Sequence, residues 1–409
     1  MDALTTPSNW QRVRLGDIAE IKRGASPRPI ENPKWFCANS NVGWVRISDI
    51  SKNSRFLYKT AQKLSKKGIE KSRLVKQNSL IMSMCATIGK PIITKIDTCI
   101  HDGFVVFENP KIDLNYLYYF LCYIEKEWLE SGQQGSQVNL NVDLIKNKEV
   151  FCPKDLNEQA AIANILSDVD RYLCSLDALI LKKESVKKAL RIKMLNQILA
   201  SNGVEFRELG DIILSLKTGL NPRSFFKLNT PNANNYYVTI RELEDYTIKF
   251  THQTDRIDDN ALSLCLKRSN LEKDDILFSG TGTIGKVSII EKNPNNWAVK
   301  EGIYSIKPNK KIVFPRFLMF CLESSNIQND IKNKSFGGIV KSIPMNDLQQ
   351  IQIPLPPLNE QIAIANILSG LDSEIISLKN KKRQFENIKK ALNHDLMSAK
   401  IRVLKKSVL

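Results

Sequence analysis

The feature that most constrains this chain is a tandem repeat at an offset of 202 residues. The segment Leu-Asn-Glu-Gln at 156–159 recurs at 358–361. The match continues through Ile-Ala-Asn-Ile-Leu-Ser at 162–167 and 364–369. A period this long predicts two copies of one folding unit rather than a single large domain.

The repeat extends, with more divergence, into the segments that precede these matches. Leu-Gly-Asp-Ile occurs at 15–18 and 209–212, and Thr-Ile-Gly-Lys occurs at 87–90 and 283–286. Each copy therefore consists of a diverged globular head followed by a well-matched tail. We expect the two tails to share one task, and the two heads to perform different versions of another.

The tails have the spacing of long helices, with apolar residues at alternate steps of three and four, as in the seam of a coiled coil. Each helix should run for about 40 residues, roughly 60 Å, and begin at an N-cap asparagine, Asn157 or Asn359. We expect the two helices to pack antiparallel, which relates the copies by a pseudo-two-fold axis; packing of each helix on its own head is the alternative. The predicted seam residues are Ile162, Ile165, Val169, Leu176 and Leu190 in the first helix, and Ile364, Ile367, Leu371, Leu378 and Leu392 in the second.

The heads mix strand-like runs, turns and one helix, so the predicted fold class is α/β (α+β) heads plus long helices. Strand-like runs lie at 45–47, 79–82, 91–93 and 103–107, helical spacing lies at 114–128, and the second head repeats this order. The predicted domains are the first head at 1–155, the first helix at 156–200, the second head at 201–357 and the second helix at 358–409.

The net charge of +17 favours a polyanionic partner. Residues 1–155 have a net charge of +7 and residues 201–357 a net charge of +3. Two basic heads on a fixed spacer suit a DNA duplex, because the spacer would set the distance between two half-sites. Divergent heads would make those half-sites different in sequence.

The segment Gly-Thr-Gly-Thr-Ile-Gly-Lys at 280–286 imitates several cofactor loops. Val287 stands where a phosphate loop needs Ser or Thr, and the residues that follow are strand-like where a dinucleotide loop needs a helix. The first copy keeps only Gly89 and Lys90 of this pattern. We therefore predict a tight turn between two strands and no cofactor site.

Other protein classes find no support in the sequence. It contains no apolar run of about 18 residues, so no membrane partner is expected, and the first residues do not resemble a secretion signal. Eight cysteines without a C-x-x-C pair and three dispersed histidines predict reduced thiols and no metal site in a cytoplasmic protein. No catalytic constellation is apparent, so we expect no enzymatic activity.

The Leu-Asn-Glu-Gln motif follows Ile-Pro-Leu-Pro-Pro at 353–357, and each head begins with Leu-Gly-Asp. With the order head, helix, head, helix, these motifs resemble the DNA-specificity (S) subunit of type I restriction-modification systems over essentially the whole chain. The first copy departs from the pattern, because Cys-Pro-Lys-Asp at 152–155 replaces the proline-rich run.

The resemblance implies that each head is a target recognition domain, and that the chain reads a bipartite, asymmetric site on double-stranded DNA. It implies that the helices dock two modification (methyltransferase) subunits, which restriction subunits join. S-adenosylmethionine, ATP and Mg are then expected on those partners, with none on this chain. The alternatives are a specificity module of another restriction architecture, or a coiled-coil scaffold without DNA readout.

Side chains that read DNA are mostly Arg, Lys, Asn and Gln. For each such residue here, an ordinary solvated side chain is the alternative. The candidate DNA-binding residues are Arg23, Arg28, Arg46, Lys90 and Gln134 in the first head, and Arg223, Arg241 and Lys286 in the second.

Overall fold

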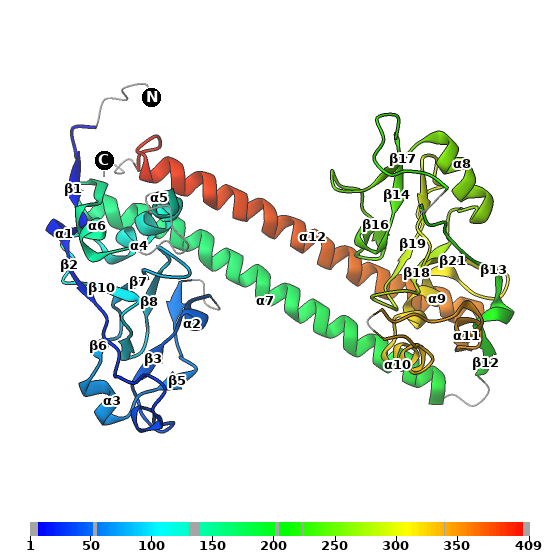
Figure 1. Ribbon diagram of the computed structural model, residues 1–409, viewed down its shortest axis with the longest axis horizontal. Helices are drawn as coiled ribbons and strands as arrows, with labels where there is room; N and C mark the ends of the chain where they lie inside the picture. The colour runs from blue at the N-terminus through cyan, green and yellow to red at the C-terminus, as the bar shows by residue number, and fades with distance from the viewer. Residues whose placement is uncertain are drawn as a thin grey trace, which may run out of the picture. The chain divides into compact units, whose positions relative to one another are not determined.

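The structure is a computed structural model that describes residues 7–51, 55–130, 140–200, 204–222, 225–338 and 340–403. The chain divides into two compact units, called unit 1 (Met1–Leu176 with Lys382–Leu409) and unit 2 (Asp177–Lys381). Each unit contains one head and a segment of each long helix (Figure 1). The two units therefore have the same make-up, as the tandem repeat predicts.

The head of unit 1 combines antiparallel and parallel strand pairs. Its strands are β1 (Trp10–Arg14), β2 (Glu20–Arg23), β3 (Gly43–Val45), β4 (Phe56–Leu57), β5 (Gln62–Lys63), β6 (Arg73–Val75), β7 (Leu80–Ser83), β8 (Pro91–Thr94), β9 (Thr98–Ile100), β10 (Phe104–Glu108) and β11 (Glu149–Pro153). One sheet has the order β2-β10-β7-β8-β4, and another has the order β5-β3-β9-β6. In the second sheet β3 runs parallel to β9, whereas β1 and β11 form a separate antiparallel pair.

Short helices cover these strands, and α4 is the most deeply buried of those described. The helices of this head are α1 (Leu15–Ile18), η1 (Pro33–Trp35), α2 (Ile47–Ser51), α3 (Lys66–Glu70), α4 (Leu114–Tyr123), α5 (Glu125–Glu130) and α6 (Val142–Asn147). The main core joins Tyr116, Leu117 and Phe120 of α4 to the buried faces of β7 and β10.

The head of unit 2 repeats this plan. Its strands are β12 (Glu205–Glu208), β13 (Ile213–Thr218), β14 (Asn235–Val238), β15 (Leu243–Glu244), β16 (Thr247–Ile248), β17 (Arg256–Ile257), β18 (Ile276–Ser279), β19 (Val287–Ile289), β20 (Trp297–Val299), β21 (Ile303–Pro308) and β22 (Gln352–Leu355). One sheet has the order β13-β21-β18-β19, another has the order β17-β14-β20, and β12 pairs with β22. The parallel pair β14 and β20 matches β3 and β9 of unit 1.

The helices of the second head occupy equivalent places in the chain. They are η2 (Leu209–Ile212), η3 (Ile240–Glu242), α8 (Asp259–Arg268), α9 (Pro315–Leu322), α10 (Ser325–Asn333) and α11 (Met345–Gln349). Helix α9 fills the role of α4, since Phe317, Leu318 and Phe320 pack into the core of this head.

Most of the strands predicted in the first head are confirmed. The runs at 79–82, 91–93 and 103–107 correspond to β7, β8 and β10. The strand predicted at 45–47 is wrong beyond Val45, because the Asp49 carboxylate accepts the Arg46 N–H at 2.9 Å and the chain turns into α2. The helix predicted at 114–128 is divided at Ile124 into α4 and α5.

The tails form the two long helices, α7 (Leu156–Ala200) and α12 (Leu358–Met397). The prediction that Asn157 and Asn359 are N-caps is wrong, because both lie inside the first turn. The Asn157 N–H instead donates to the side chain of Asp155 at 2.9 Å, so the residue before the helix supplies the cap.

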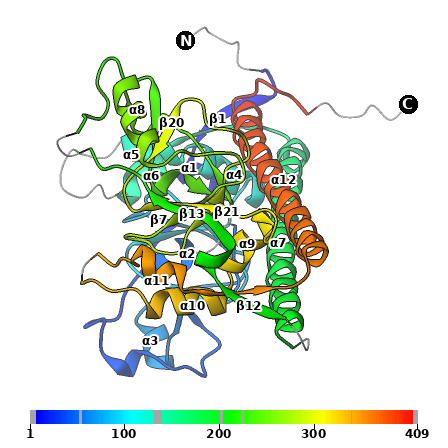
Figure 2. The same ribbon diagram turned by 90° about the vertical axis from the view of Figure 1, so that its right-hand side faces the viewer.

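The helix segments pack antiparallel in each unit, as predicted (Figures 1 and 2). In unit 1 the rings of Tyr172 and Phe385 lie 4.6 Å apart, and Asp170 pairs with Lys389. In unit 2 residue 183 pairs with 374, and residue 187 pairs with 372. In both units the residue numbers of the two helices therefore run in opposite directions.

The residues predicted for the seam differ in burial. Ile162 and Leu176 are buried, whereas Ile165 and Ile367 are 36% and 47% exposed. The first turns of each helix pack on their own head, where Ile162, Ala163 and Leu166 join the α4 core and Ala365 and Leu368 join the α9 core. The start of each long helix is therefore buried against its own head, which is the alternative named above. The contact between the two helices begins further along. The other predicted seam residues are half-buried, namely Val169, Leu190, Ile364, Leu371, Leu378 and Leu392.

The glutamine of the repeated motif joins each long helix to its head. Gln159 accepts the Asp113 N–H at 2.8 Å and donates to the Pro153 carbonyl at 2.8 Å. Gln361 accepts the Phe314 N–H at 2.8 Å and donates to the Pro356 carbonyl at 2.9 Å. Asp113 and Phe314 are the N-cap residues of α4 and α9. Each glutamine, 1% exposed, thus bonds the preceding segment and the head helix at once.

The replacement Gln361→Ala should lower the free energy of unfolding by about 2–4 kcal/mol, because it leaves the part-buried Phe314 N–H and the buried Pro356 carbonyl without this partner. Urea unfolding of the full chain measures this loss. Gln350→Ala is the matched control, since Gln350 is exposed and accepts only a lysine hydrogen bond. An equal loss in both variants would contradict the role assigned to Gln361.

The helices are also joined by two repeat-equivalent ion pairs, Lys187–Asp372 in unit 2 and Lys389–Asp170 in unit 1. Lys187→Met should destabilise the protein by about 3 kcal/mol, because Asp372 is left as an unpaired charge. The side chains of that pair are only 10% and 15% exposed. Lys379→Met, which breaks the exposed pair with Glu184 (45% and 42% exposed), should cost less than about 1 kcal/mol. Double-mutant cycles with Asp372→Asn for the first pair and Glu184→Gln for the second would test this difference.

Candidate nucleic-acid interface

Two of the candidate arginines of the first head meet at one acidic residue, Asp102, in the turn between β9 and β10. Arg23 donates to the Asp102 carbonyl at 2.7 Å. Arg28 donates to the Asp102 carboxylate at 2.7 Å, and Ser26 donates to its other oxygen at 2.9 Å. We call these four residues, with His101, the Asp102 cluster.

A glycine allows this cluster to form. Gly24 follows β2 and lies so close to β9 that an added Cβ would stand 2.0 Å from the carbonyl oxygen of His101. Its repeat equivalent, Gly219, has the same approach to the carbonyl oxygen of Val299. Only glycine permits this contact, which brings the segment containing Ser26 and Arg28 next to Asp102.

The charges of the Asp102 cluster are fixed by their surroundings. Burial lowers the pKa of His101, and the nearby charge of Arg46 lowers it further. Burial opposes ionisation of Asp102, but the Ser26 hydrogen bond and the Arg28 charge outweigh it and lower the pKa of that carboxyl. At neutral pH the cluster therefore holds a neutral imidazole, a carboxylate and two guanidinium groups.

The remaining candidates of the first head lie apart from these contacts. Arg46 lies at the end of β3, near enough to His101 to affect its pKa. Lys90 lies in the turn between β7 and β8, where its charge opposes the upward effect of burial on the pKa of Glu125. Gln134 lies outside the described residues.

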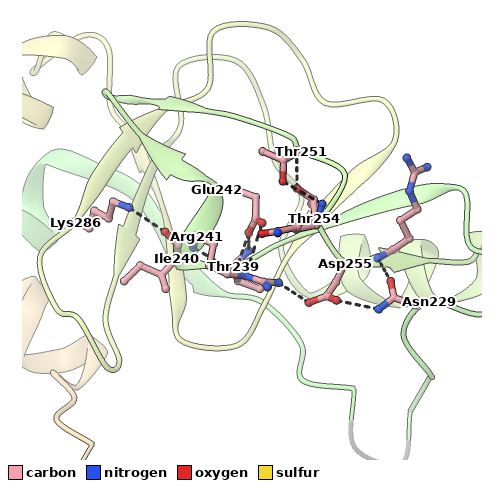
Figure 3. Close-up of polar contacts among 11 residues, drawn as sticks. Asn229, Thr239, Ile240, Arg241, Glu242, Thr251, Thr254, Asp255 and Lys286 are labelled. Atoms are coloured by element: carbon pink, nitrogen blue, oxygen red, sulfur yellow. Dashed lines mark hydrogen bonds and ion pairs between the residues drawn. The ribbon is translucent and has the colours of Figure 1, made fainter. Parts of the chain in front are cut away.

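In the second head the structure brings Arg241 and Lys286 to one short turn (Figure 3). Arg241 follows Ile240 in η3 and donates to the Asp255 carboxylate at 2.7 Å. Lys286 donates to the Ile240 carbonyl at 3.1 Å. Asn229 donates to the other oxygen of Asp255 at 2.9 Å. The third candidate of this head, Arg223, lies outside the described residues.

A buried carboxylate fixes the shape of this turn. Glu242 accepts the backbone N–H and the hydroxyl of Thr239, both at 2.8 Å, and Thr239 in turn accepts the Arg241 N–H at 3.3 Å. This is a capping box, which satisfies the free N–H groups at the start of η3. The exposed Arg241 thus projects from a rigid backbone.

Sequence reasoning found the arginines but not the acids that hold them. Asp102 had a signal, because Asp-Gly at 102–103 aligns with Glu-Gly at 301–302 within the repeat. Asp255 had none, since it lies 14 residues from Arg241 and just before β17. Both acids leave most of the guanidinium N–H groups available to a ligand, which suits hydrogen bonding to bases or phosphates.

The glycine-rich segment at 280–286 is the turn between antiparallel strands β18 and β19, as predicted. Its amides are already bonded within the protein: the N–H of Gly282 donates to the Lys341 carbonyl, and that of Gly285 donates to the Ser279 carbonyl. The Lys286 N–H donates to the Ser279 hydroxyl at 2.8 Å. These three amides, which a phosphate-binding loop would offer to its ligand, are therefore occupied here.

Two further properties concern the part of the chain that the structure describes. Within it, no group of three or more His, Cys, Asp and Glu side chains is arranged to hold a metal ion. Within the same residues, no helix is both long enough and apolar enough to cross a membrane.

The long helices expose a matched set of apolar residues. Unit 1 exposes Leu156, Ile165 and Ile388. Unit 2 exposes their repeat equivalents, Leu358, Ile367 and Val186. We call each set an apolar helix trio. Exposed apolar residues therefore recur at equivalent positions of the long helices in the two units.

Comparison with known proteins identifies the repeat. The family model described as the type I restriction modification DNA specificity domain matches residues 7–183 and again residues 201–387. A relative from Methanocaldococcus jannaschii, named for the type I restriction enzyme MjaX specificity subunit, is 27% identical over 97% of this chain and 95% of its own length. The EcoBI specificity subunit of Escherichia coli is 31% identical over 27% of this chain and 23% of its own length.

Solved structures show the same fold. The S subunit of a type I restriction-modification system from M. genitalium superposes with a TM-score of 0.60 and 16% identity, over 96% of this chain and 97% of that one. A second chain, from a study of the assembly of a type I system, gives a TM-score of 0.56 over 96% of this chain. The chain thus belongs to the type I restriction-modification DNA specificity family, with one specificity domain in each half.

Proposed function

We propose that this chain is the DNA-specificity subunit of a type I restriction-modification complex, and that its two heads read the two different halves of a bipartite site. The observation that best supports this is the pair of unequal clusters in otherwise equivalent heads. Arg28 is held by Asp102 in one head and Arg241 by Asp255 in the other. Reading two different half-sites requires one framework that presents different hydrogen-bond donors in the two heads.

The second part of the proposal concerns partners. Two modification subunits bind the helices, one at each apolar helix trio, and restriction subunits join that core. The relatives are named as specificity subunits of restriction enzymes, which supports such an assembly. The chain itself is then non-catalytic. S-adenosylmethionine, ATP and Mg act on the partners, and the complex works in the cytoplasm, where it meets cellular DNA.

Exchanging the head at 1–155 for that of another family member should change one half of the methylated site and leave the other half unchanged. The reason is that each head has its own core and its own cluster. Mapping of methylated adenines in DNA treated with the assembled complex measures this. An unchanged site, or a change in both halves, would contradict independent reading by the heads.

The partner surface can be tested with charged substitutions. Ile165→Glu and Ile367→Glu should each remove one modification subunit, and the double variant should remove both, because a buried charge at an apolar contact costs at least about tenfold in affinity. Native mass spectrometry of the complex counts the bound subunits. Leu181→Glu is the control, since Leu181 is exposed but its repeat equivalent is Arg383. Loss of subunits in the control alone would rule out the helix trios as the docking surface.

A further inference from the structure

One turn has the same framework in both heads but presents different side chains. It follows β3 in the first head and β14 in the second, and each of these strands lies parallel to its neighbour. In the first head the buried Asp49 accepts the Arg46 N–H at 2.9 Å, and in the second the buried Glu242 accepts the Thr239 N–H at 2.8 Å. In both turns, therefore, a carboxylate at the fourth position accepts a hydrogen bond from the backbone N–H of the first position.

The arginine stands at a different place in each turn. The first head has Arg46 at the first position and Ser48 at the third, whereas the second has Thr239 at the first and Arg241 at the third. Since the framework is shared, the exchange moves the guanidinium along the turn without changing the fold. This is the pattern expected of positions that determine which base pairs a head reads.

In the second head the arginine is held in place (Figure 3). Its Nη2 bonds one oxygen of Asp255 at 2.7 Å, while its Nε lies 3.4 Å from the Thr239 hydroxyl. Asn229 fixes the other oxygen of Asp255 at 2.9 Å. The Arg241 side chain nevertheless remains 54% exposed, so its outer N–H groups face solvent.

A carboxylate beside an arginine has two physical effects on DNA contacts. It restricts the rotamers of the side chain, so less conformational entropy is lost when the guanidinium forms two parallel bonds to a base. It also repels phosphate, which disfavours contacts that would hold the same guanidinium on the DNA backbone. Both effects favour a base edge with two adjacent acceptors, which in the major groove is guanine O6 and N7.

Resting on the DNA-reading function proposed above, we propose that Arg241 reads a guanine within the half-site of the second head, and that Asp255 is the positioning residue that commits Arg241 to a base rather than to phosphate. In the first head the arginine of the equivalent turn is Arg46, which lies two positions earlier in that turn. The difference in arginine placement then contributes to the asymmetry of the site.

The test uses the full complex with its modification subunits and a set of duplexes in which each base pair of the mapped site is replaced in turn. Arg241→Ala should abolish discrimination at one G·C pair of the second half-site, a loss of about tenfold or more, and leave the first half-site unchanged. Asp255→Asn should lose discrimination at the same pair. It should also bind non-specific DNA more tightly, with a steeper dependence on salt.

Two further variants separate positioning from folding. Asn229→Ala removes the second contact of Asp255, together with the hydrogen bond that the Asn229 side chain accepts from the Arg256 N–H at 2.8 Å, and should reduce discrimination at the same base pair by a smaller factor. Asp274→Asn breaks an exposed ion pair with Lys310 in the same head and should leave the profile unchanged. If Asp255→Asn does not fold, Asn229→Ala decides the question.

The outcomes are distinguishable. A uniform loss of affinity for all duplexes in Arg241→Ala, with a shallower salt dependence, would show a phosphate contact and overturn the proposal. An unchanged profile in both Asp255→Asn and Asn229→Ala would overturn the positioning role. If the complex with the wild-type chain discriminated no base in either half-site, the proposed function itself would fail.

Discussion

The buried hydrogen bonds of Gln159 and Gln361 set the geometry on which the rest of each unit depends. Each glutamine bonds backbone groups of the segment that enters the long helix and of the helix that lies at the centre of the head. A buried amide with satisfied partners has one favourable orientation, and any other leaves polar groups unpaired. The direction in which a long helix leaves its head is therefore fixed by a single side chain, present at the same place in both copies.

Because the framework rests on buried side chains and close backbone contacts, the exposed surface of the heads is free to vary. Ser83 and Ser279 close equivalent turns through backbone carbonyls, and Gly24 and Gly219 permit equivalent close approaches. None of these contacts requires a particular side chain on the exposed face. Substitution there changes the donors offered to a ligand at little cost in stability. One fold can thus present two different arrangements of arginine.

The repeat, the long helices and most strands could be predicted, because periodicity and identity between copies are local signals. The seam positions Ile165 and Ile367 could not, because contact of the first helical turns with α4 and α9 decides which side is buried. The site was predictable only in part. Arginines are visible in a sequence, but the acids that hold them come from non-equivalent segments, the β9–β10 turn for Asp102 and the residue before β17 for Asp255.

The ion pairs between the helices connect these two levels of structure. Apolar residues are often at least as stabilising as buried ion pairs, so the recurrence of Lys187–Asp372 as Lys389–Asp170 at equivalent positions points to a role in specifying register. In each unit a tyrosine of the head bonds the same pair: Tyr119 donates to Asp170, and Tyr246 accepts from Lys187. A shift of the helices would therefore break contacts with the head as well as with each other. The same charged residues thus contribute to the register of the two helices and to the contact between each head and the helices.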